Sequence, residues 1–445
     1  MVTILKAGPR ITGRLHVLEV YLSQIQSLTG MLDVLPEDQP YWDWIIETGS
    51  DLAYRYGFSR IDVPIIENTE LFERGVGTAS DFFVQKEMYT IAEEEGSITL
   101  RPEFTAGVVR AYIEHGLQQW PQPVKLFAIG PIFRRERPQA GRFRQHSQFN
   151  CEILGEIDPA ADVEVMMVAM NLYRELGFAG LTFQLNSTGC PVCKPDYVQA
   201  LTAYLSRHLD QLADVDRERL RRNPLRVLDS KEPGMDELLA GAPHIVDHLC
   251  TDCRDHFREL RVLLEALGQS YTINFRLVRG IDYYVKTVFE VWAEGIGAQA
   301  ALCGGGRYDG LAEAIGGPAT PGVGFGSGIE RIVLGLKEGE HRPPALPRPE
   351  VMIAHFGGET KVAAVKLAFQ LRDGHIGARL AFARGRRSMK SQLREANKYD
   401  IRTVLIIGDV EIAENSVTVK PMDGGEQFHL PQNELLAYLQ QREGR

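Results

Sequence analysis

The chain has 445 residues, with 49 Lys and Arg against 59 Asp and Glu, so its formal net charge is −10 at pH 7. This length suggests about three structural units, and a content of 44% hydrophobic and 24% charged residues excludes wholesale disorder, a collagen-like repeat and a disulfide-dense mini-protein. The acidic balance argues against a uniformly basic surface that coats nucleic acid, but it leaves room for local basic patches.

The N-terminal segment and the cysteine content predict a cytoplasmic protein. The chain contains no run of about 18 apolar residues, so no membrane span is expected. The N-terminal residues also lack the pattern of a secretory signal. Leu15, Leu18, Leu22 and Ile25 recur at helical spacing, which predicts a docking helix or a poorly ordered extension over residues 1–29. Six cysteines are too few for a secreted disulfide scaffold, so a reducing compartment is expected.

The next segment predicts an antiparallel α+β core. Apolar spacing indicates a helix over 41–56. Alternation over 61–64 predicts a short strand, whose Pro64 implies an edge or strand-end position. Further strands and one helix are expected at 97–100, 124–133, 150–154 and 161–176. The polar turn at 134–145 is too short for a crossover helix, so the strands on either side of it form a long antiparallel hairpin.

A helical insertion is predicted at about residues 188–270, because strands at 181–186 and 271–277 flank a mostly helical stretch. Strand-like and Gly-rich segments and a helix complete a catalytic domain over residues 30–340, at 287–292, 304–310, 322–328 and 329–336.

Prolines predict a short, stiff linker over residues 341–349, and the texture of the chain changes after it. Residues 350–445 alternate strand and helix patterns, which is typical of an α/β module with parallel strands. The strands are expected at 351–355, 379–383 and 403–407, and the helices at 359–372 and 388–398.

Two basic patches stand out against the negative net charge. The hairpin turn at 133–144 holds five arginines and one glutamate, and Arg134 at a strand end suits bidentate phosphate binding while Phe143 could stack on a base. The second patch, at 372–398, holds eight Lys or Arg against two acids. Each could also be an ordinary solvated surface. Patches in two domains suit a long polyanion better than a small ligand.

A glycine-rich run at 322–328 opens a helix that carries Arg331. It lacks the preceding βαβ strand and downstream ribose-binding acid of a Rossmann site, so dinucleotide binding is rejected. We expect these glycines to let a strand and helix pack closely beneath a ligand, with Arg331 pointing toward a phosphate.

Two CxxC pairs, Cys190-x-x-Cys193 and Cys250-x-x-Cys253, lie in the helical insertion. In a reducing compartment this spacing is typical of tetrahedral Zn²⁺, and four thiolates leave no open position, so the zinc would be structural. The alternative is four unrelated thiols.

Several strings resemble class II aminoacyl-tRNA synthetases. Residues 54–67 resemble motif 1, Phe133-Arg134-x-Glu136 with Phe143 resembles motif 2, and 322–336 resembles motif 3. Two strings narrow the resemblance to the histidyl-tRNA synthetase family, at 277–284 and 305–311. The resemblance begins at about Gly30 and implies a class II antiparallel-sheet catalytic core with a helical insertion and a C-terminal α/β anticodon-binding domain over 350–445.

The resemblance implies a histidine–tRNA ligase that makes histidyl-adenylate from histidine and ATP with Mg²⁺ and passes the histidyl group to the 3′ end of tRNAHis. Arg134 and Arg279 would bind the α-phosphate from opposite sides, Arg331 the γ-phosphate, and Phe143 the adenine. A homodimer formed through motif 1 is also implied. Neither a membrane nor DNA is an expected partner.

The resemblance also implies roles in histidine and tRNA binding. Residues for the α-amino group are Glu103, Thr105 and Gln148, and those for the imidazole are Glu152, Tyr283 and Tyr284. Candidate tRNA contacts are Arg137 and Gln139 at the acceptor end and Arg386, Arg387 and Lys390 in the C-terminal domain. Phe104 stands where the family commonly has Gly, and we expect it to crowd the loop near the α-amino group.

Two other protein classes share part of this pattern. The regulatory subunit of ATP phosphoribosyltransferase resembles the synthetase, usually without the anticodon-binding domain and often without the arginine found here as Arg279. This chain has both features, which favours the synthetase. A tRNA-sensing domain of a stress kinase is disfavoured because no kinase motif occurs in the chain.

Overall fold

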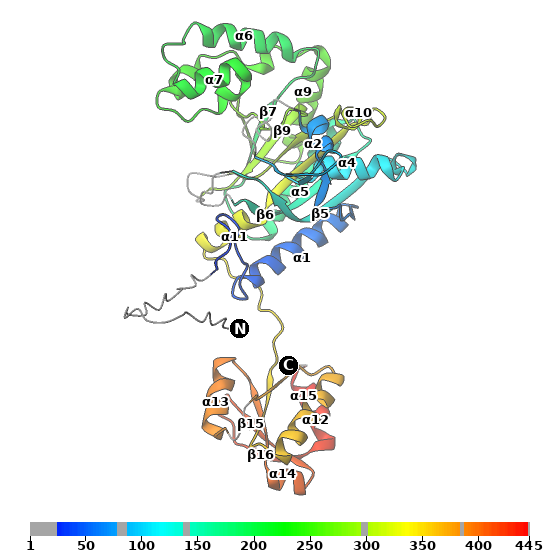
Figure 1. Ribbon diagram of the computed structural model, residues 1–445, viewed down its shortest axis with the longest axis vertical. Coiled ribbons are helices and arrows are strands. Elements are labelled where there is room, and N and C mark those ends of the chain that lie inside the picture. Colours follow the sequence, from blue (N-terminus) through cyan, green and yellow to red (C-terminus); the bar gives the residue numbers. More distant parts are fainter. Residues whose placement is uncertain (1–24, 78–86, 137–142, 295–300, 383–386, 444–445) are drawn as a thin grey trace, which may run out of the picture. The chain divides into compact units, whose positions relative to one another are not determined.

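The computed structural model describes residues 25–77, 87–136, 143–294, 301–382 and 387–443 (Figure 1). They form two compact units, with the boundary between Pro344 and Ala345. Most of the predicted N-terminal helix, including Leu15, Leu18 and Leu22, lies outside the described residues. The side chain of Ile25 is 97% exposed.

The first unit is built on an eight-stranded sheet whose centre is antiparallel, which confirms the predicted α+β core. In spatial order its strands are β1 (Ser59–Arg60), β5 (Val124–Phe133), β6 (Gln145–Leu154), β11 (Gly322–Gly328), β10 (Ala301–Arg307), β9 (Val285–Trp292), β7 (Thr182–Ser187) and β8 (Tyr271–Ile273). Only the outer pairs, β1–β5 and β7–β8, run parallel.

The predicted hairpin is confirmed as β5 and β6, which pair over ten positions from Val124 opposite Leu154 to Phe133 opposite Gln145. The prediction of a strand at 61–64 is wrong. The edge strand β1 comes two residues earlier, and the carbonyl of Val63 accepts a hydrogen bond from Arg101 at 2.6 Å instead of joining the sheet.

Three predicted helices, α1 (Gln39–Arg55), α5 (Pro159–Glu175) and α11 (Ile329–Glu338), cover one face of this sheet (Figure 1). Helix α1 approaches β6 closely, since a side chain at Gly49 would come within 3.1 Å of the Phe149 ring. The apolar side chains of this layer form the largest buried cluster in the described chain.

A smaller sheet and several short elements were not predicted. They are β2 (Ile66–Asn68), β3 (Tyr89–Ala92), α2 (Thr69–Val76), α4 (Thr105–Glu114), α10 (Leu311–Ala314) and a 3-10 turn (Leu117–Gln119). The sheet has the order β2-β4-β3, and of its strands only β4 (Ser97–Leu100) was expected. Elements this short carry too few residues for a clear hydrophobic period.

The predicted insertion is confirmed as a helical subdomain between β7 and β8, drawn in green in Figure 1. Its helices are α6 (Lys194–Ser206), α7 (Asp214–Arg222), α8 (Met235–Ala240) and α9 (Thr251–Ala266), with 3-10 turns at Pro224–Asp229 and Ile245–Asp247. Helix α9 packs on α5. The strand expected at 271–277 already ends at Ile273.

The second unit is an α/β domain with the sheet order β13-β12-β14-β15-β16. Its elements are β12 (Val351–His355), α12 (Glu359–Asp373), β13 (Ala378–Leu380), α13 (Met389–Lys398), β14 (Thr403–Ile407), α14 (Asp409–Ala413), β15 (Ser416–Pro421), β16 (Phe428–Pro431) and α15 (Gln432–Glu443). Strands β13, β12 and β14 run parallel, as predicted, whereas the antiparallel edge of β15 and β16 was not expected. Among the described residues, no helix is long and apolar enough to cross a membrane.

Candidate active site

The candidate pocket is the group of side chains around one buried carboxylate. Glu152 is only 1% exposed, and its two oxygens accept hydrogen bonds from the hydroxyls of Thr105 (2.6 Å) and Tyr308. The sheet register places Gly324 opposite Glu152, and a Cβ there would lie 1.6 Å from the carboxylate. Burial raises the pKa of Glu152 to about 8. Gly324 therefore leaves the room that this acid occupies.

Three tyrosines surround this carboxylate. The ring centroids of Tyr283 and Tyr284 are 4.7 Å apart, and Tyr308 meets Tyr283 edge-on at 5.6 Å. The structure thus brings together the residues predicted to read an imidazole and adds Tyr308. Sequence reasoning gave Tyr308 no role, although it lies within the string at 305–311.

Glu103 has a structural position as well as a place near the pocket. It is 4% exposed, and its carboxylate accepts the N–H groups of Thr105 (2.5 Å) and Ala106 (2.9 Å) at the start of α4. Burial raises its pKa, while those hydrogen bonds and the charge of Arg134 oppose the rise. The carboxylate therefore fixes the loop that carries Thr105.

Two neighbouring residues have contrasting surroundings. Gln148 is partly exposed on β6 and lies beside Gly326, where a Cβ would come within 3.2 Å of its Oε1. Phe104 does not crowd the loop. It is 1% exposed and packs in the core beneath Arg101, whose guanidinium carbon is 4.1 Å from the ring centroid. The prediction for Phe104 was wrong because the ring points into the apolar cluster between α4 and the sheet.

Arg279 lies across the glycines of β10. Its Nη1 donates to Glu290 at 2.9 Å, and its guanidinium carbon is 5.9 Å from the Tyr284 centroid. A Cβ at Gly304 would come within 2.2 Å of this guanidinium, and one at Gly306 within 2.8 Å of Tyr284. These two glycines of β10 therefore make room for the side chains of Arg279 and Tyr284.

Two of the three arginines predicted to bind ATP, Arg134 and Arg331, lower the pKa of the same histidine. Nε of Arg134 donates to the carbonyl of Pro102 at 2.9 Å, and Nη1 of Arg331 donates to the carbonyl of Ala301 at 2.9 Å. Burial lowers the pKa of His146 to about 3, and the charges of both arginines add to the shift. His146 is therefore neutral at pH 7, and both cations face one electropositive region.

Phe143 lies next to that region, at the start of the second strand of the hairpin. It is partly exposed, and its carbonyl is 3.2 Å from the His146 ring nitrogen. A partly exposed aromatic ring suits stacking on a nucleobase.

The four cysteines of the insertion meet, as the spacing predicted. Their sulfur atoms all lie within 4.8 Å of one another, with Cys190 3.8 Å from Cys193 and 3.7 Å from Cys250. Zn²⁺ with four ligands at about 2.3 Å would set sulfur–sulfur separations of about 3.8 Å in a regular tetrahedron. These distances fit such an ion.

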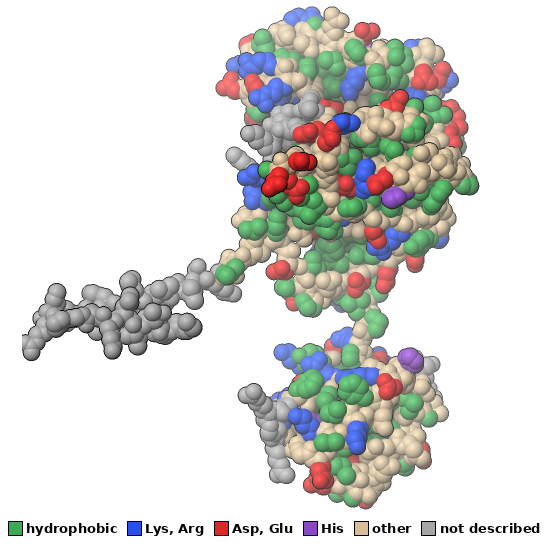
Figure 2. All heavy atoms as spheres, turned by 45° about the vertical axis from the view of Figure 1, so that its right-hand side comes forward, with side chains coloured by type: hydrophobic (Ala, Val, Ile, Leu, Met, Phe, Trp, Pro, Cys, Tyr) green, Lys and Arg blue, Asp and Glu red, His purple; other side chains and the backbone are tan. Residues whose placement is uncertain are grey.

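The predicted tRNA contacts are only partly described, since Arg137, Gln139 and Arg386 lie outside the described residues. Arg387 donates to Glu395 at 2.5 Å and to Ser391 Oγ at 3.0 Å, so part of its charge is balanced within the domain. Lys390 is exposed on α13. Figure 2 shows both charges interspersed on the visible surface, without a uniform basic coat.

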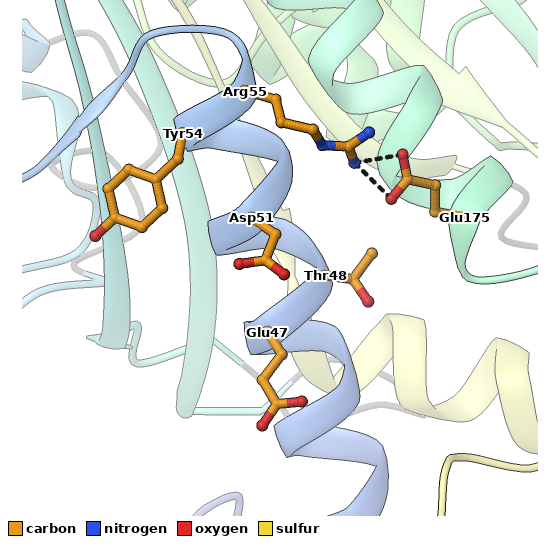
Figure 3. Close-up of a pocket in the computed structure, with 6 residues that line it drawn as sticks. All are labelled: Glu47, Thr48, Asp51, Tyr54, Arg55 and Glu175. Atoms are coloured by element: carbon orange, nitrogen blue, oxygen red, sulfur yellow. Dashed lines mark hydrogen bonds and ion pairs between the residues drawn. The ribbon is translucent and has the colours of Figure 1, made fainter.

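A separate surface pocket lies between α1 and α5 (Figure 3). Its acids include Glu47 and Asp51, and Arg55 donates to both oxygens of Glu175 at 2.6 and 2.7 Å. Because its only lining cation is already paired, this pocket does not suit ATP.

Comparisons with known proteins cover nearly the whole chain. The family described as "Histidyl-tRNA synthetase" matches residues 30–332, and "Anticodon binding domain" matches 350–442. The histidine–tRNA ligase of Pelotomaculum thermopropionicum is 46% identical over 414 residues, which are 93% of this chain and 97% of the relative. That of Moorella thermoacetica is 44% identical, covering 90% and 95%. The apo histidyl-tRNA synthetase of S. aureus superposes with a TM-score of 0.77 at 34% identity, covering 93% of this chain and 99% of that one.

Proposed function

The chain belongs to the histidyl-tRNA synthetase family, and from this premise we propose that it attaches histidine to tRNAHis in two ATP-dependent steps. The observation that carries the proposal is the buried carboxylate of Glu152, held by Thr105 and Tyr308 beside Tyr283. A dry acceptor ringed by phenols matches an imidazole, which has both an N–H donor and an acceptor nitrogen.

The hydrogen-bond donors and acceptors of this site account for the selection of histidine. Glu152 accepts the imidazole N–H, and the phenols of Tyr283 and Tyr284 surround the ring. Glu103 and Gln148, with the Thr105 hydroxyl, receive the α-ammonium group. An amino acid without the ring would lack the hydrogen bonds that the imidazole makes with these buried polar groups, and such a loss costs about 10⁴-fold in specificity. Selection at this level needs no editing site.

In the first step a histidine carboxylate oxygen attacks the α-phosphorus of ATP. The new oxygen–phosphorus bond replaces the bond between the α-phosphorus and the oxygen that bridges to the β-phosphate. Pyrophosphate leaves with the electron pair of the broken bond. Arg134 and Arg279 stabilise the α-phosphoryl group from opposite sides, Arg331 binds the γ-phosphate, and Phe143 stacks on adenine. Mg²⁺ arrives with ATP and reduces the charge on its phosphates.

In the second step the ribose hydroxyl at the 3′ end of tRNAHis takes the histidyl group from the adenylate and releases AMP. Arg137 and Gln139 meet the acceptor end, while Arg386, Arg387 and Lys390 contribute contacts in the C-terminal domain. The exposed ammonium of Lys390 suits a phosphate. The protein works in the cytoplasm as a homodimer, in which the motif 1 segment, residues 54–67, contributes to the twofold interface.

The cysteine cluster binds one structural Zn²⁺ in this proposal. The support is the fit of the sulfur separations to a tetrahedral site, together with six cysteines that form no disulfide. The ion joins the two ends of the helical insertion.

Histidine-dependent ATP–pyrophosphate exchange tests the proposed activation step. Purified protein should exchange pyrophosphate into ATP with histidine and not with glutamine or phenylalanine. Exchange that is absent, or that does not depend on which amino acid is added, would contradict the proposal. Circular dichroism on the same sample establishes that the protein is folded.

A further inference from the structure

Lys286 stands between the cysteine cluster and the tyrosines of the pocket. It follows Tyr284 by two residues on β9, and its φ of +53° is one that residues other than glycine rarely adopt. Val288 pairs with Gly306 but Val285 pairs with Arg307, so β9 carries a bulge that contains Lys286. Bulges next to a site redirect the side chains beside them.

The segment beside the first CxxC pair (Cys190 and Cys193, called the first knuckle) holds the backbone of this bulge. The N–H of Lys286 donates to the carbonyl of Gly189 at 2.7 Å, and the N–H of Thr188 donates to the carbonyl of Lys286 at 2.8 Å. The Thr188 hydroxyl donates to the carbonyl of Tyr284 at 3.1 Å. Gly189 directly precedes Cys190, so a ligand of the cluster is one residue from these contacts.

The second CxxC pair (Cys250 and Cys253, called the second knuckle) holds the side chain of Lys286. Nζ of Lys286 lies 3.1 Å from the carboxylate of Asp252, which stands between Cys250 and Cys253. The Lys286 side chain is only 8% exposed, whereas that of Asp252 is 74% exposed. Burying this ammonium beside a mostly exposed partner costs free energy of folding. The reaction steps described above do not use the ammonium of Lys286.

We propose that the cysteine cluster, when it holds its metal, is a positioning element for histidine binding. It fixes the Lys286 bulge through both knuckles and so sets Tyr283 and Tyr284 against Glu152. This inference rests on the proposed function and on the proposed zinc site. Of the arginines proposed to bind ATP, Arg134 and Arg331 lie outside the bulge, at the end of β5 and on α11, and Arg279 is held by Glu290 farther along β9. We therefore expect ATP binding to depend on the bulge much less than histidine binding does.

The structure supplies a matched pair of variants. Asp252→Ala removes the partner of Lys286 from an exposed position on α9, and Asp255→Ala removes another exposed acid of the same helix that pairs only with Arg258. Lys286→Met tests the ion pair from its other side, and Lys286→Arg restores the charge.

We expect Asp252→Ala and Lys286→Met to raise the KM for histidine about tenfold in pyrophosphate exchange, with the KM for ATP changed by less than about twofold. Lys286→Arg should recover most of the loss, Asp255→Ala should match the parent, and all four should keep one zinc. An unchanged KM for histidine in Asp252→Ala would overturn the proposal, as would equal increases in both KM values.

Hydrogen exchange of the parent protein gives a readout that needs no activity. After chelation, the amides of Thr188 and Lys286, which donate across the bulge, should exchange at least about tenfold faster, while those of central β5 stay protected. Unaltered exchange at the bulge after zinc loss would refute the link. A parent protein that binds zinc and shows this response but lacks histidine-dependent exchange would instead refute the proposed function.

Discussion

Tyr308 donates its hydroxyl to Glu152, although Glu152 belongs to β6 and Tyr308 follows β10, with β11 between them. Together with the Thr105 bond, this contact satisfies both carboxylate oxygens before any ligand arrives. The acid is therefore held in place away from water, and several consequences can be measured.

Glu152 should make stability depend on pH. Because burial raises its pKa from 4.5 to about 8, the folded protein holds a proton between these values that the unfolded chain has released. This group's stabilising contribution is full below about pH 4.5 and is lost as pH rises through 8. Relative to the parent, Glu152→Gln should therefore gain thermal stability between pH 5 and 8. If the melting temperatures of the parent and the variant changed with pH in the same way across this range, the raised pKa of Glu152 would be contradicted.

Gly324→Ala should strongly weaken the binding of histidine. The added methyl would lie 1.6 Å from the Glu152 carboxylate, whereas at Gly328 the nearest atom, Cβ of Arg331, is 4.0 Å away. We expect Gly324→Ala to weaken histidine binding by at least about 100-fold in calorimetric titration, and Gly328→Ala to bind within about threefold of the parent. Equal affinities for the two variants would show that the carboxylate does not contact histidine.

Arg279→Ala should slow adenylation without greatly weakening histidine binding, because the guanidinium acts on charge that develops at the α-phosphate. Loss of such a group typically costs about 10²–10³ in kcat. Pre-steady-state formation of histidyl-adenylate gives the rate, and equilibrium dialysis gives the affinity. Unaltered adenylation kinetics would remove Arg279 from the reaction.

Metal analysis of the purified protein should find about one zinc per chain. Cys253→Ser should lose it, whereas Cys303→Ser, which alters a buried cysteine outside the cluster, should retain it. Chelation should also lower the melting temperature, since the ion ties together both ends of the insertion. Zinc-free protein with an unchanged melting temperature would rule out a structural ion.

Lys390→Ala should raise the KM for tRNAHis in charging and leave pyrophosphate exchange intact, because Lys390 lies in the C-terminal domain. Lys361→Ala is the control, since Lys361 is also exposed in that domain but lies on α12. One lost phosphate contact should weaken tRNA binding roughly tenfold at low salt and less at high salt. Indistinguishable KM values for the two variants would exclude Lys390 from the tRNA interface.

The sequence predicted those parts of the fold that local patterns determine. The hairpin of β5 and β6 followed from two apolar runs around a turn too short for a crossover, and the cysteine cluster followed from two CxxC pairs. The contact of Tyr308 with Glu152 could not be predicted, because it depends on the register of three strands that are distant in sequence.

Other errors have equally local causes. Phe104 was expected at the pocket, but the fold turns its ring into the core beneath Arg101. Residues 61–64 alternate like a strand, yet Arg101 takes the carbonyl of Val63 that a sheet would have used. The place of Lys286 between the two knuckles had no sequence signal, since neither its positive φ nor its ion pair with Asp252 is visible in the chain.

Charging of tRNAHis with labelled histidine tests the central claim most directly. The folded parent protein should form acid-precipitable histidyl-tRNA that depends on ATP, with histidine the only amino acid accepted. A folded protein that binds histidine but forms neither adenylate nor histidyl-tRNA would contradict the account and indicate a regulatory subunit built on the same fold.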